Sequence, residues 1–211
     1  MNFQLSEEHL AVKDAARDFA ENACKPGVID RDRDQIVPLD QLKQLGELGF
    51  MGMMVDPKYG GSGMDTLSYV LAIEEISKVD NSCSVLMSVN NSLVCWGIES
   101  FGTEEQKEKY LPKLATGQWI GSFCLSEPEA GSDATSQRTT AVDMGDHYLL
   151  NGTKNWITNG GSSSLHLVIA QTNPELGHRG INVLIVEADQ AGVVVGAKED
   201  KLGIRSSDTH T

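Results

Sequence analysis

The sequence lacks the features that mark several large classes of protein. None of its apolar runs approaches the length needed to cross a membrane. Acidic residues outnumber basic ones 30 to 17, and no cluster of lysine and arginine offers a face for nucleic acid. The 5 histidines are scattered, without the spacing of metal ligands. The sequence therefore predicts a protein without membrane insertion, nucleic-acid binding or a metal centre.

Cysteine is also scarce. Only 4 cysteines occur, none of them in a C-x-x-C pair. Cys95 and Cys124 lie in apolar runs, which favours buried free thiols in a reducing compartment. No leader-like segment precedes the first amphipathic stretch. We therefore expect a cytoplasmic protein, or one of the mitochondrial matrix if a transit peptide has been removed.

The first half of the chain has a helical pattern. Its 211 residues and 40% hydrophobic content suffice for one or two folded domains. Apolar residues recur at helical spacing up to residue 117, and Ser6, Asp65 and Thr103 are suitable helix caps. Thr103 and Gln106 together form a capping box. We expect an all-α domain over residues 1–118.

The second half has a strand pattern with turn-forming residues between the strands. The expected strands are Ile120–Leu125, Thr139–Val142, His147–Asn151, Trp156–Ile157, Leu165–Thr172, Ile181–Glu187 and Gly192–Gly196. Short strands with breaks marked by glycine are typical of a small β-barrel or sandwich. The predicted fold is therefore α+β with two domains: a helical domain followed by a β domain over residues 119–211.

Three polar features of the helical domain allow more than one interpretation. The mixed-sign run Asp30–Asp34 is typical of a solvated loop. The neighbouring carboxylates Glu74 and Glu75 invite acid–base chemistry, but adjacent residues of a helix point in different directions, which favours a surface face with one bonded carboxylate. Asn90, Asn91 and Ser92 interrupt an apolar helix, and both hydrogen bonding within the bundle and a pocket role stay open.

Two segments of the β domain carry most of the functional information. The first runs from Phe123 to Asp133 (FCLSEPEAGSD) and the second from Asn151 to Gly161 (NGTKNWITNGG). Each is a strand end that continues into a turn. They place hydroxyls, free amides and the indole of Trp156 beside loops. This set of groups suits a flat aromatic ligand with polar edges, because the indole can stack on the ring while hydroxyls and amides form hydrogen bonds with its heteroatoms.

The stretches Leu125–Asp133 (LSEPEAGSD) and Trp156–Gly160 (WITNG) resemble the two flavin-site signatures of the acyl-CoA dehydrogenase family, in particular its short-chain, butyryl-CoA branch. The resemblance covers nearly the whole chain. It implies FAD as cofactor and an acyl-CoA thioester as substrate, which is oxidised to the trans-2-enoyl-CoA. It also implies an electron-transfer flavoprotein as electron acceptor and a homotetramer.

The resemblance implies a flavin-binding set of amides, hydroxyls and aromatic or apolar side chains: Phe123, Leu125, Ser126, Trp156, Ile157 and Thr158. In this set the amides of Leu125 and Ser126, with the Ser126 hydroxyl, bond the pyrimidine edge of the flavin. Trp156 packs against the ring, and the Thr158 hydroxyl bonds near N5. Ser132 corresponds to a residue that contacts the coenzyme A part of the substrate.

The resemblance further implies a third, helical domain that supplies the catalytic carboxylate, and no residue of this chain is assigned that role. We therefore expect residues 1–211 alone to lack dehydrogenase activity. Two other interpretations stay open. One is a relative with the same flavin site that acts as an acyl-CoA oxidase or a flavin hydroxylase. The other is a truncated product that acts only as a binding or structural partner, without flavin.

Overall fold

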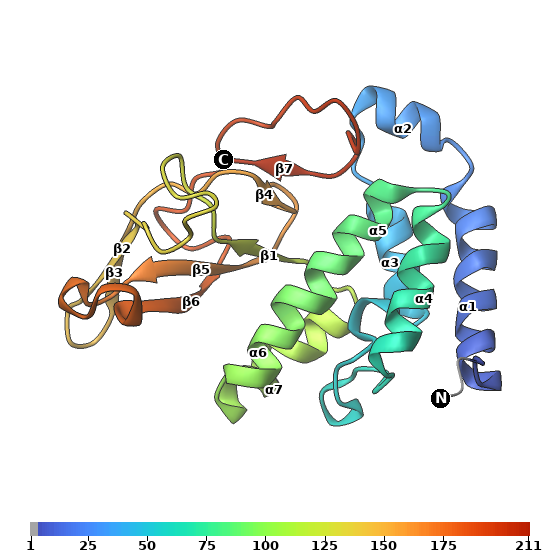
Figure 1. Ribbon diagram of the computed structural model, residues 1–211, viewed down its shortest axis with the longest axis horizontal. Helices are drawn as coiled ribbons and strands as arrows, with labels where there is room; N and C mark the ends of the chain where they lie inside the picture. Colours follow the sequence, from blue (N-terminus) through green and yellow to red (C-terminus); the bar gives the residue numbers. More distant parts are fainter. Residues whose placement is uncertain (1–3) are drawn as a thin grey trace. The chain divides into compact units, whose positions relative to one another are not determined.

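The computed structural model describes residues 4–211 and divides them into two compact units (Figure 1). The helical unit contains the chain up to Trp119 together with Asp200–Ser207, and the β unit contains Ile120–Glu199 and Asp208–Thr211. The predicted order, helices first and strands second, is confirmed. The return of residues 200–207 to the helical unit has no signal in the local sequence.

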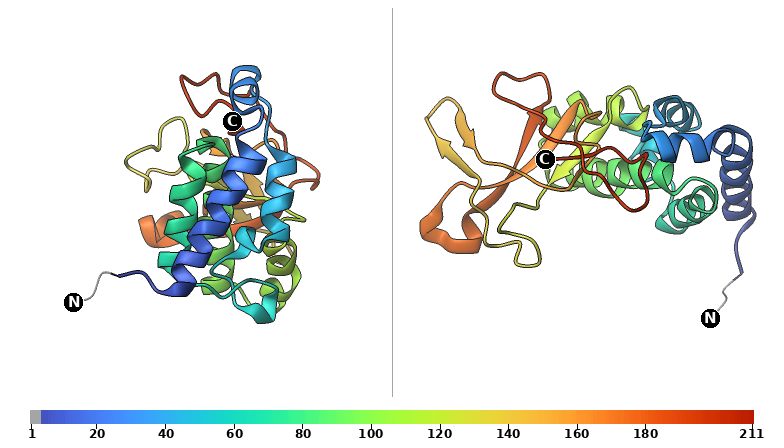
Figure 2. Two further views of the ribbon diagram at one scale, coloured as in Figure 1. Left: turned by 90° about the vertical axis from the view of Figure 1, so that its right-hand side faces the viewer. Right: turned by 90° about the horizontal axis from the view of Figure 1, so that it is seen from above.

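The helical unit is built from short, capped helices. They are α1 (Glu7–Phe19), α2 (Val28–Asp34), α3 (Leu39–Glu47), α4 (Thr66–Ser77), α5 (Asn81–Ser88), α6 (Trp96–Phe101) and α7 (Glu104–Ala115), with π-helical segments at Ala20–Cys24 and Val89–Cys95. Side chains of Ser6, Asp65 and Thr103 accept a first-turn amide at the helix starts, as the sequence predicts. Helices α1 and α4 pack side by side (Figure 2). None of the helices formed by residues 4–211 is long and apolar enough to span a bilayer.

The mixed-sign run Asp30–Asp34 was expected as a loop and instead forms most of α2. Arg31 donates from Nη2 to Asp80 Oδ2 over 2.9 Å, and the side chain of Arg31 is only 13% exposed. Asp32 accepts a hydrogen bond of 2.7 Å from the Arg205 amide. Asp80 and Arg205 are both distant from α2 in the sequence. The local charge pattern therefore could not reveal the contacts that hold α2 in the helical unit.

The paired carboxylates of α4 have the structural role that helix geometry favours. Glu75 is 4% exposed and lies 3.1 Å from Arg17 Nε and 2.8 Å from Lys78 Nζ. Glu74 is exposed and also contacts Lys78. One of the two is therefore a buried, fully paired carboxylate and the other a surface residue, which matches the expectation.

Asn90 and Asn91 are both buried in the helical unit. The Asn90 amide donates to the carbonyl oxygens of Met51 and Leu114. Asn91 donates to two further backbone carbonyls and accepts from the Met53 amide at 2.8 Å. Of the two open interpretations, hydrogen bonding within the bundle is the one observed.

The β unit contains an open mixed sheet and a small two-stranded sheet. The strands are β1 (Gly121–Cys124), β2 (Thr140–Asp143), β3 (Tyr148–Asn151), β4 (Ile157–Thr158), β5 (Leu165–Gln171), β6 (Ile181–Glu187) and β7 (Thr209–His210). The larger sheet has the order β1-β5-β2-β3, with β6 paired to β5. β1 and β2 run parallel to β5, and β6 runs antiparallel to it (Figures 1 and 2).

β5 is the central strand of the larger sheet. Six consecutive residues, Leu165–Ala170, are buried, and all of them except His166 are apolar, which fits a strand between the neighbours β1 and β6. β2 joins β5 only through the pair Thr140–Gln171. The strands described over residues 120–211 therefore form a β-rich fold without closing into a barrel.

The largest differences from the predicted strands lie at the edges of the β unit. Gly192–Gly196, predicted as a strand, is irregular. Its Gly196 amide instead bonds the Thr211 carbonyl at 2.7 Å. β7 was not predicted, and it exists because Thr209 and His210 pair antiparallel with β4, about fifty residues earlier. Two-residue strands carry too little periodicity to be found from sequence.

Candidate functional site

The two segments singled out by sequence meet where β1 and β4 lie in contact. The Asn155 amide donates to the Ser126 carbonyl over 2.9 Å. Asn159 Nδ2 donates to the Gly121 carbonyl over 2.9 Å. Residues 155–159 are therefore fixed at one end to the first segment and at the other to the start of β1, which holds the side chains between them in place.

Trp156 combines backbone strain with an exposed ring. Its φ is 61°, in the left-handed region that bulky residues rarely adopt. Its side chain is 62% exposed, so core packing does not offset a strain of about 1–3 kcal/mol. A large aromatic residue kept at such a position is typical of a binding site.

Two hydroxyl groups lie on the same segments. Ser126 directly follows β1, and Thr158 belongs to β4; both are half-buried. Within residues 4–211 neither hydroxyl is hydrogen-bonded to another side chain. They are therefore available to a ligand that reaches this edge of the β unit.

The other predicted site residues have different surroundings. Phe123 lies in β1 and Leu125 follows it, and both are half-buried. Ile157 is 5% exposed and packs with Cys124 and Val168 in the core of the β unit, so its side chain supports the segment from behind. Ser132 is exposed in the loop between β1 and β2.

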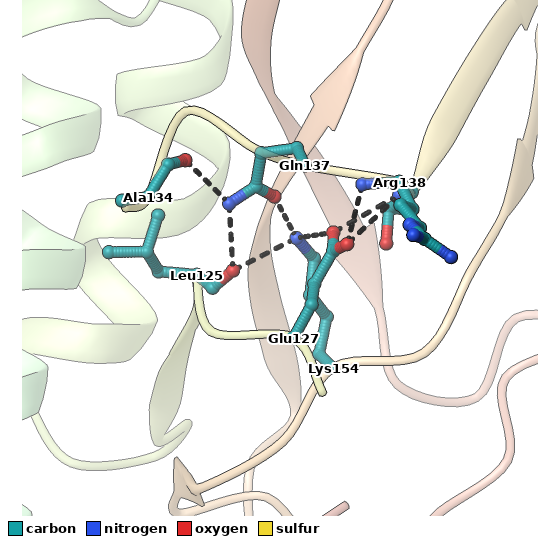
Figure 3. A network of polar contacts seen from close by, with 7 residues as sticks. Leu125, Glu127, Ala134, Gln137, Arg138 and Lys154 are labelled. Carbon is teal, nitrogen blue, oxygen red and sulfur yellow. Dashed lines mark hydrogen bonds and ion pairs between the residues drawn. The ribbon is translucent and has the colours of Figure 1, made fainter. Parts of the chain in front are cut away.

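A charged pair that joins the two segments is not among the site residues predicted from the sequence. Lys154 Nζ lies 2.6 Å from Glu127 Oε1, and the side chains are 9% and 3% exposed (Figure 3). Lys154 also donates to the Leu125 carbonyl at 3.0 Å and to Gln137 Oε1. The available signal was the one basic residue of the two segments, Lys154, two residues before Trp156. Glu127, one of three acidic residues in the first segment, directly follows Ser126.

Glu127 is held by the backbone as well as by Lys154. Its carboxylate accepts the amides of Arg138 at 2.6 Å and Thr139 at 3.1 Å. Burial opposes ionisation of Glu127, but the hydrogen bonds from Lys154 and from these residues outweigh it and lower its pKa to about 2.

Lys154 has the partners of a charged ammonium. Burial lowers its pKa, and Glu127 opposes that shift. Each of the three donors of the ammonium has an acceptor: Leu125 O, Glu127 Oε1 and Gln137 Oε1. Burial thus favours the neutral amine, while the three hydrogen bonds favour the charged ammonium. Because every donor of the ammonium has an acceptor, the Lys154–Glu127 pair is ionised at neutral pH.

A cavity of about 500 Å³ also lies in the β unit, with a largely apolar lining that includes Val168 and Val186. His166 lines it, and His166 Nδ1 lies 2.6 Å from Ser122 Oγ. Burial lowers the pKa of His166, which favours the neutral ring. Ser126, Trp156 and Thr158 do not line this cavity. No group of three or more potential metal ligands occurs among residues 4–211.

Comparisons with known proteins agree with the resemblance of the two segments. Residues 6–118 match the acyl-CoA dehydrogenase N-terminal domain, and residues 122–211 match the acyl-CoA dehydrogenase middle domain. The short-chain specific acyl-CoA dehydrogenase of Clostridium acetobutylicum is 44% identical over 209 residues, which cover 99% of this chain and 55% of that protein.

Solved structures show the same fold. Butyryl-CoA dehydrogenase from Megasphaera elsdenii matches with a TM-score of 0.96 and 41% identity, over 100% of this chain and 56% of that one. A chain from the structural work on the electron transferring flavoprotein of Acidaminococcus fermentans matches with a TM-score of 0.97 and 45% identity, over 100% and 55%. The chain spans about half the length of these relatives. Since the two domain matches together cover nearly all of it, the chain belongs to the acyl-CoA dehydrogenase family.

Proposed function

We propose that residues 1–211 belong to an FAD-dependent acyl-CoA dehydrogenase that oxidises a short-chain acyl-CoA to the trans-2-enoyl-CoA. The observation that carries this proposal is Trp156, an exposed and strained indole fixed beside the Ser126 and Thr158 hydroxyls. Family membership supports the reaction class. Similarity to butyryl-CoA dehydrogenase supports a short acyl chain.

The residues present fit a flavin ring. The indole of Trp156 offers an open face for stacking. Ser126, through its amide and hydroxyl, and Leu125, through its amide, would hold the pyrimidine edge, and the Thr158 hydroxyl would bond near N5. Phe123 would complete the cradle, and Ile157 would support it from the core of the β unit. Bound FAD would supply the redox chemistry, while these residues bind and orient it.

The reaction needs groups beyond this cradle. Removing a weakly acidic α-proton requires a carboxylate base, and the charge that develops on the thioester oxygen requires hydrogen-bond donors. No residue of 1–211 is assigned as the base, so we expect this stretch alone to show no turnover. Ser132 would contact the coenzyme A part of the substrate.

The partners and the location are part of the same proposal. An electron-transfer flavoprotein would accept the electrons, which the match to a chain from the Acidaminococcus fermentans work supports. The full-length protein would form a homotetramer in the cytoplasm or the mitochondrial matrix, as the family resemblance implies.

The first test is flavin binding. The full-length protein purified in native form should be yellow, and Trp156→Ala should raise the dissociation constant for FAD at least tenfold. Trp96→Ala is a matched control, because Trp96 is another tryptophan more than half exposed but lies in α6 of the helical unit. A colourless protein would favour the binding or structural role.

The second test is the reaction. Under anaerobic conditions butyryl-CoA should bleach the flavin of the full-length protein, and residues 1–211 alone should not reduce an electron acceptor with butyryl-CoA. Fast oxygen consumption with butyryl-CoA would instead indicate an oxidase or hydroxylase.

A further inference from the structure

We propose that Lys154 raises the reduction potential of the bound flavin by polarising the peptide group between Leu125 and Ser126. The starting observation is the 3.0 Å hydrogen bond from Lys154 Nζ to the Leu125 carbonyl oxygen. This proposal rests on the proposed function, since it assumes that the Ser126 amide meets the pyrimidine edge of a flavin. It assigns Lys154 as a positioning residue that acts through the backbone.

The Leu125 carbonyl and the Ser126 amide belong to a single peptide group. The structure contains no cis peptide bond among the described residues, so the carbonyl and the N–H of this group point in opposite directions. A donor on the carbonyl oxygen draws electron density through the peptide and strengthens its N–H as a donor. A charged donor has roughly twice the effect of a neutral one. Lys154 therefore acts on the side of the peptide away from the amide that would face the ligand.

The surrounding contacts direct the ammonium onto that carbonyl. Glu127 is fixed by the backbone amides of Arg138 and Thr139, and it holds Lys154 Nζ at 2.6 Å. Gln137 accepts from Lys154 and itself donates to the Leu125 carbonyl at 3.2 Å. The carbonyl thus receives one cationic and one neutral donor (Figure 3).

Stability alone does not explain this arrangement. A buried ion pair often contributes no more to stability than apolar residues of the same volume. The Ser126 carbonyl, one peptide further on, also accepts a hydrogen bond, from the Asn155 amide at 2.9 Å. Two consecutive carbonyls of the first segment are therefore hydrogen-bonded to residues of the second segment. The reduced flavin carries more negative charge at its pyrimidine edge than the oxidised flavin, so stronger donors there favour reduction.

The test measures the two-electron reduction potential and the FAD dissociation constant of the full-length protein, by titration against a reference dye. Lys154→Met removes the cation. Lys154→Arg keeps a cationic donor. The double variant Glu127→Gln with Lys154→Met removes both charges and leaves no charge buried alone. Lys43→Met, at an exposed lysine of α3, is the matched control.

We expect Lys154→Met and the double variant to lower the equilibrium constant for reduction about tenfold, which corresponds to about 30 mV for two electrons. Lys154→Arg should restore most of the loss, and Lys43→Met should change nothing. A purely structural pair predicts the opposite for the double variant, namely recovery of the original potential. If the double variant has the potential of the unmodified protein, the proposal is wrong.

Two outcomes need separate interpretation. If both variants that remove the cation fail to bind FAD, Gln137→Leu decides, because it removes the neutral donor at the same carbonyl. It must then lower the potential by a smaller amount, and an unchanged potential overturns the proposal. If the unmodified protein binds no flavin at all, the proposed function itself fails, and this is seen before any variant is compared.

Discussion

Lys154 and Glu127 form a buried ion pair that ties together the two segments of the candidate site, with 2.6 Å between Nζ and Oε1. In sequence, the pair lies next to the residues that would touch a ligand. Leu125 and Ser126 precede Glu127 in the first segment, and Trp156 follows Lys154 by two residues in the second. The rigidity of the candidate site therefore depends on residues that need not contact the ligand.

Breaking this pair should destabilise the β unit. Glu127→Gln leaves the Lys154 ammonium buried without a counter-charge, which typically costs about 3–5 kcal/mol. The matched control is Glu129→Gln in the same loop, because Glu129 is exposed and pairs with the exposed Arg138. That substitution should cost less than about 1 kcal/mol.

Urea unfolding of residues 1–211 measures both changes, followed by the fluorescence of Trp156 in a background where Trp96 and Trp119 are replaced by Phe. Equal losses in the two variants would contradict the prediction, since they would show that Lys154 is readily hydrated or neutral.

Acid should weaken the helical unit through Glu75. The hydrogen bonds from Lys78 and Arg17 lower the pKa of Glu75 to about 2, against an ordinary value of 4.5. Because the pKa is lower in the folded state, the stabilisation is complete above about pH 4.5 and is lost as the pH falls toward 2.

Glu75→Gln should therefore be less stable than the unmodified protein at pH 7, and the difference should shrink as the pH falls from about 4.5 toward 2. Urea unfolding at several pH values, followed by circular dichroism at a helix wavelength, gives this difference. Glu74→Gln is the control, since Glu74 is exposed on the same helix. A difference that stays constant with pH would mean that Glu75 stabilises by packing alone.

Much of the fold was predictable because it depends on local signals. Caps such as Ser6 and Thr103 start helices where the sequence predicts them, and β5 has the apolar run of a central strand. Features that depend on distant partners were missed. α2 is held through Asp80 and Arg205, and β7 exists only through β4.

The candidate site shows the same division. The motif predicts Ser126, Trp156 and Thr158 as ligand-binding residues, because their residue types are those that a ligand of this kind needs. It did not identify the strain at Trp156, which only the backbone shows. It also left out Glu127 and Lys154, whose roles follow from burial and from their joint contact with the Leu125 region. Neither property can be read from spacing.

The buried amide of Asn91 should be essential to the helical unit. Its side chain accepts from the Met53 amide and donates to the Phe50 and Met87 carbonyls. Asn91→Leu leaves these backbone groups unpaired in a dry environment, at about 1–3 kcal/mol for each group left buried. We expect a loss of about 3 kcal/mol in the free energy of unfolding.

Asn22→Leu is the matched control, because Asn22 is an exposed asparagine that donates to a backbone carbonyl within its own helical stretch. It should cost less than about 0.5 kcal/mol. Thermal and urea unfolding of both variants provide the measurement. If Asn91→Leu leaves the free energy of unfolding unchanged, then either water replaces the amide or residues 50–53 rearrange.

Trp156 should contribute to binding and very little to stability. Trp156→Gly relieves a left-handed conformation that costs a bulky residue about 1–2 kcal/mol. The added freedom of glycine in the unfolded chain offsets about 0.5–1 kcal/mol of that gain. The indole is mostly exposed, so little packing is lost with it. The free energy of unfolding should therefore change by less than about 1 kcal/mol, while the FAD affinity falls at least tenfold.

The adjacent residue provides the contrast. Ile157 is buried in the β core, so Ile157→Ala should cost about 2–5 kcal/mol. Urea unfolding of both variants of residues 1–211, together with FAD titration of the full-length variants, separates the two roles. If Trp156→Gly destabilises the β unit as much as Ile157→Ala does, the strained backbone serves the fold. A stable Trp156→Gly variant with weakened FAD binding would instead show that the strain is retained for the ligand, because nothing in the fold compensates for it.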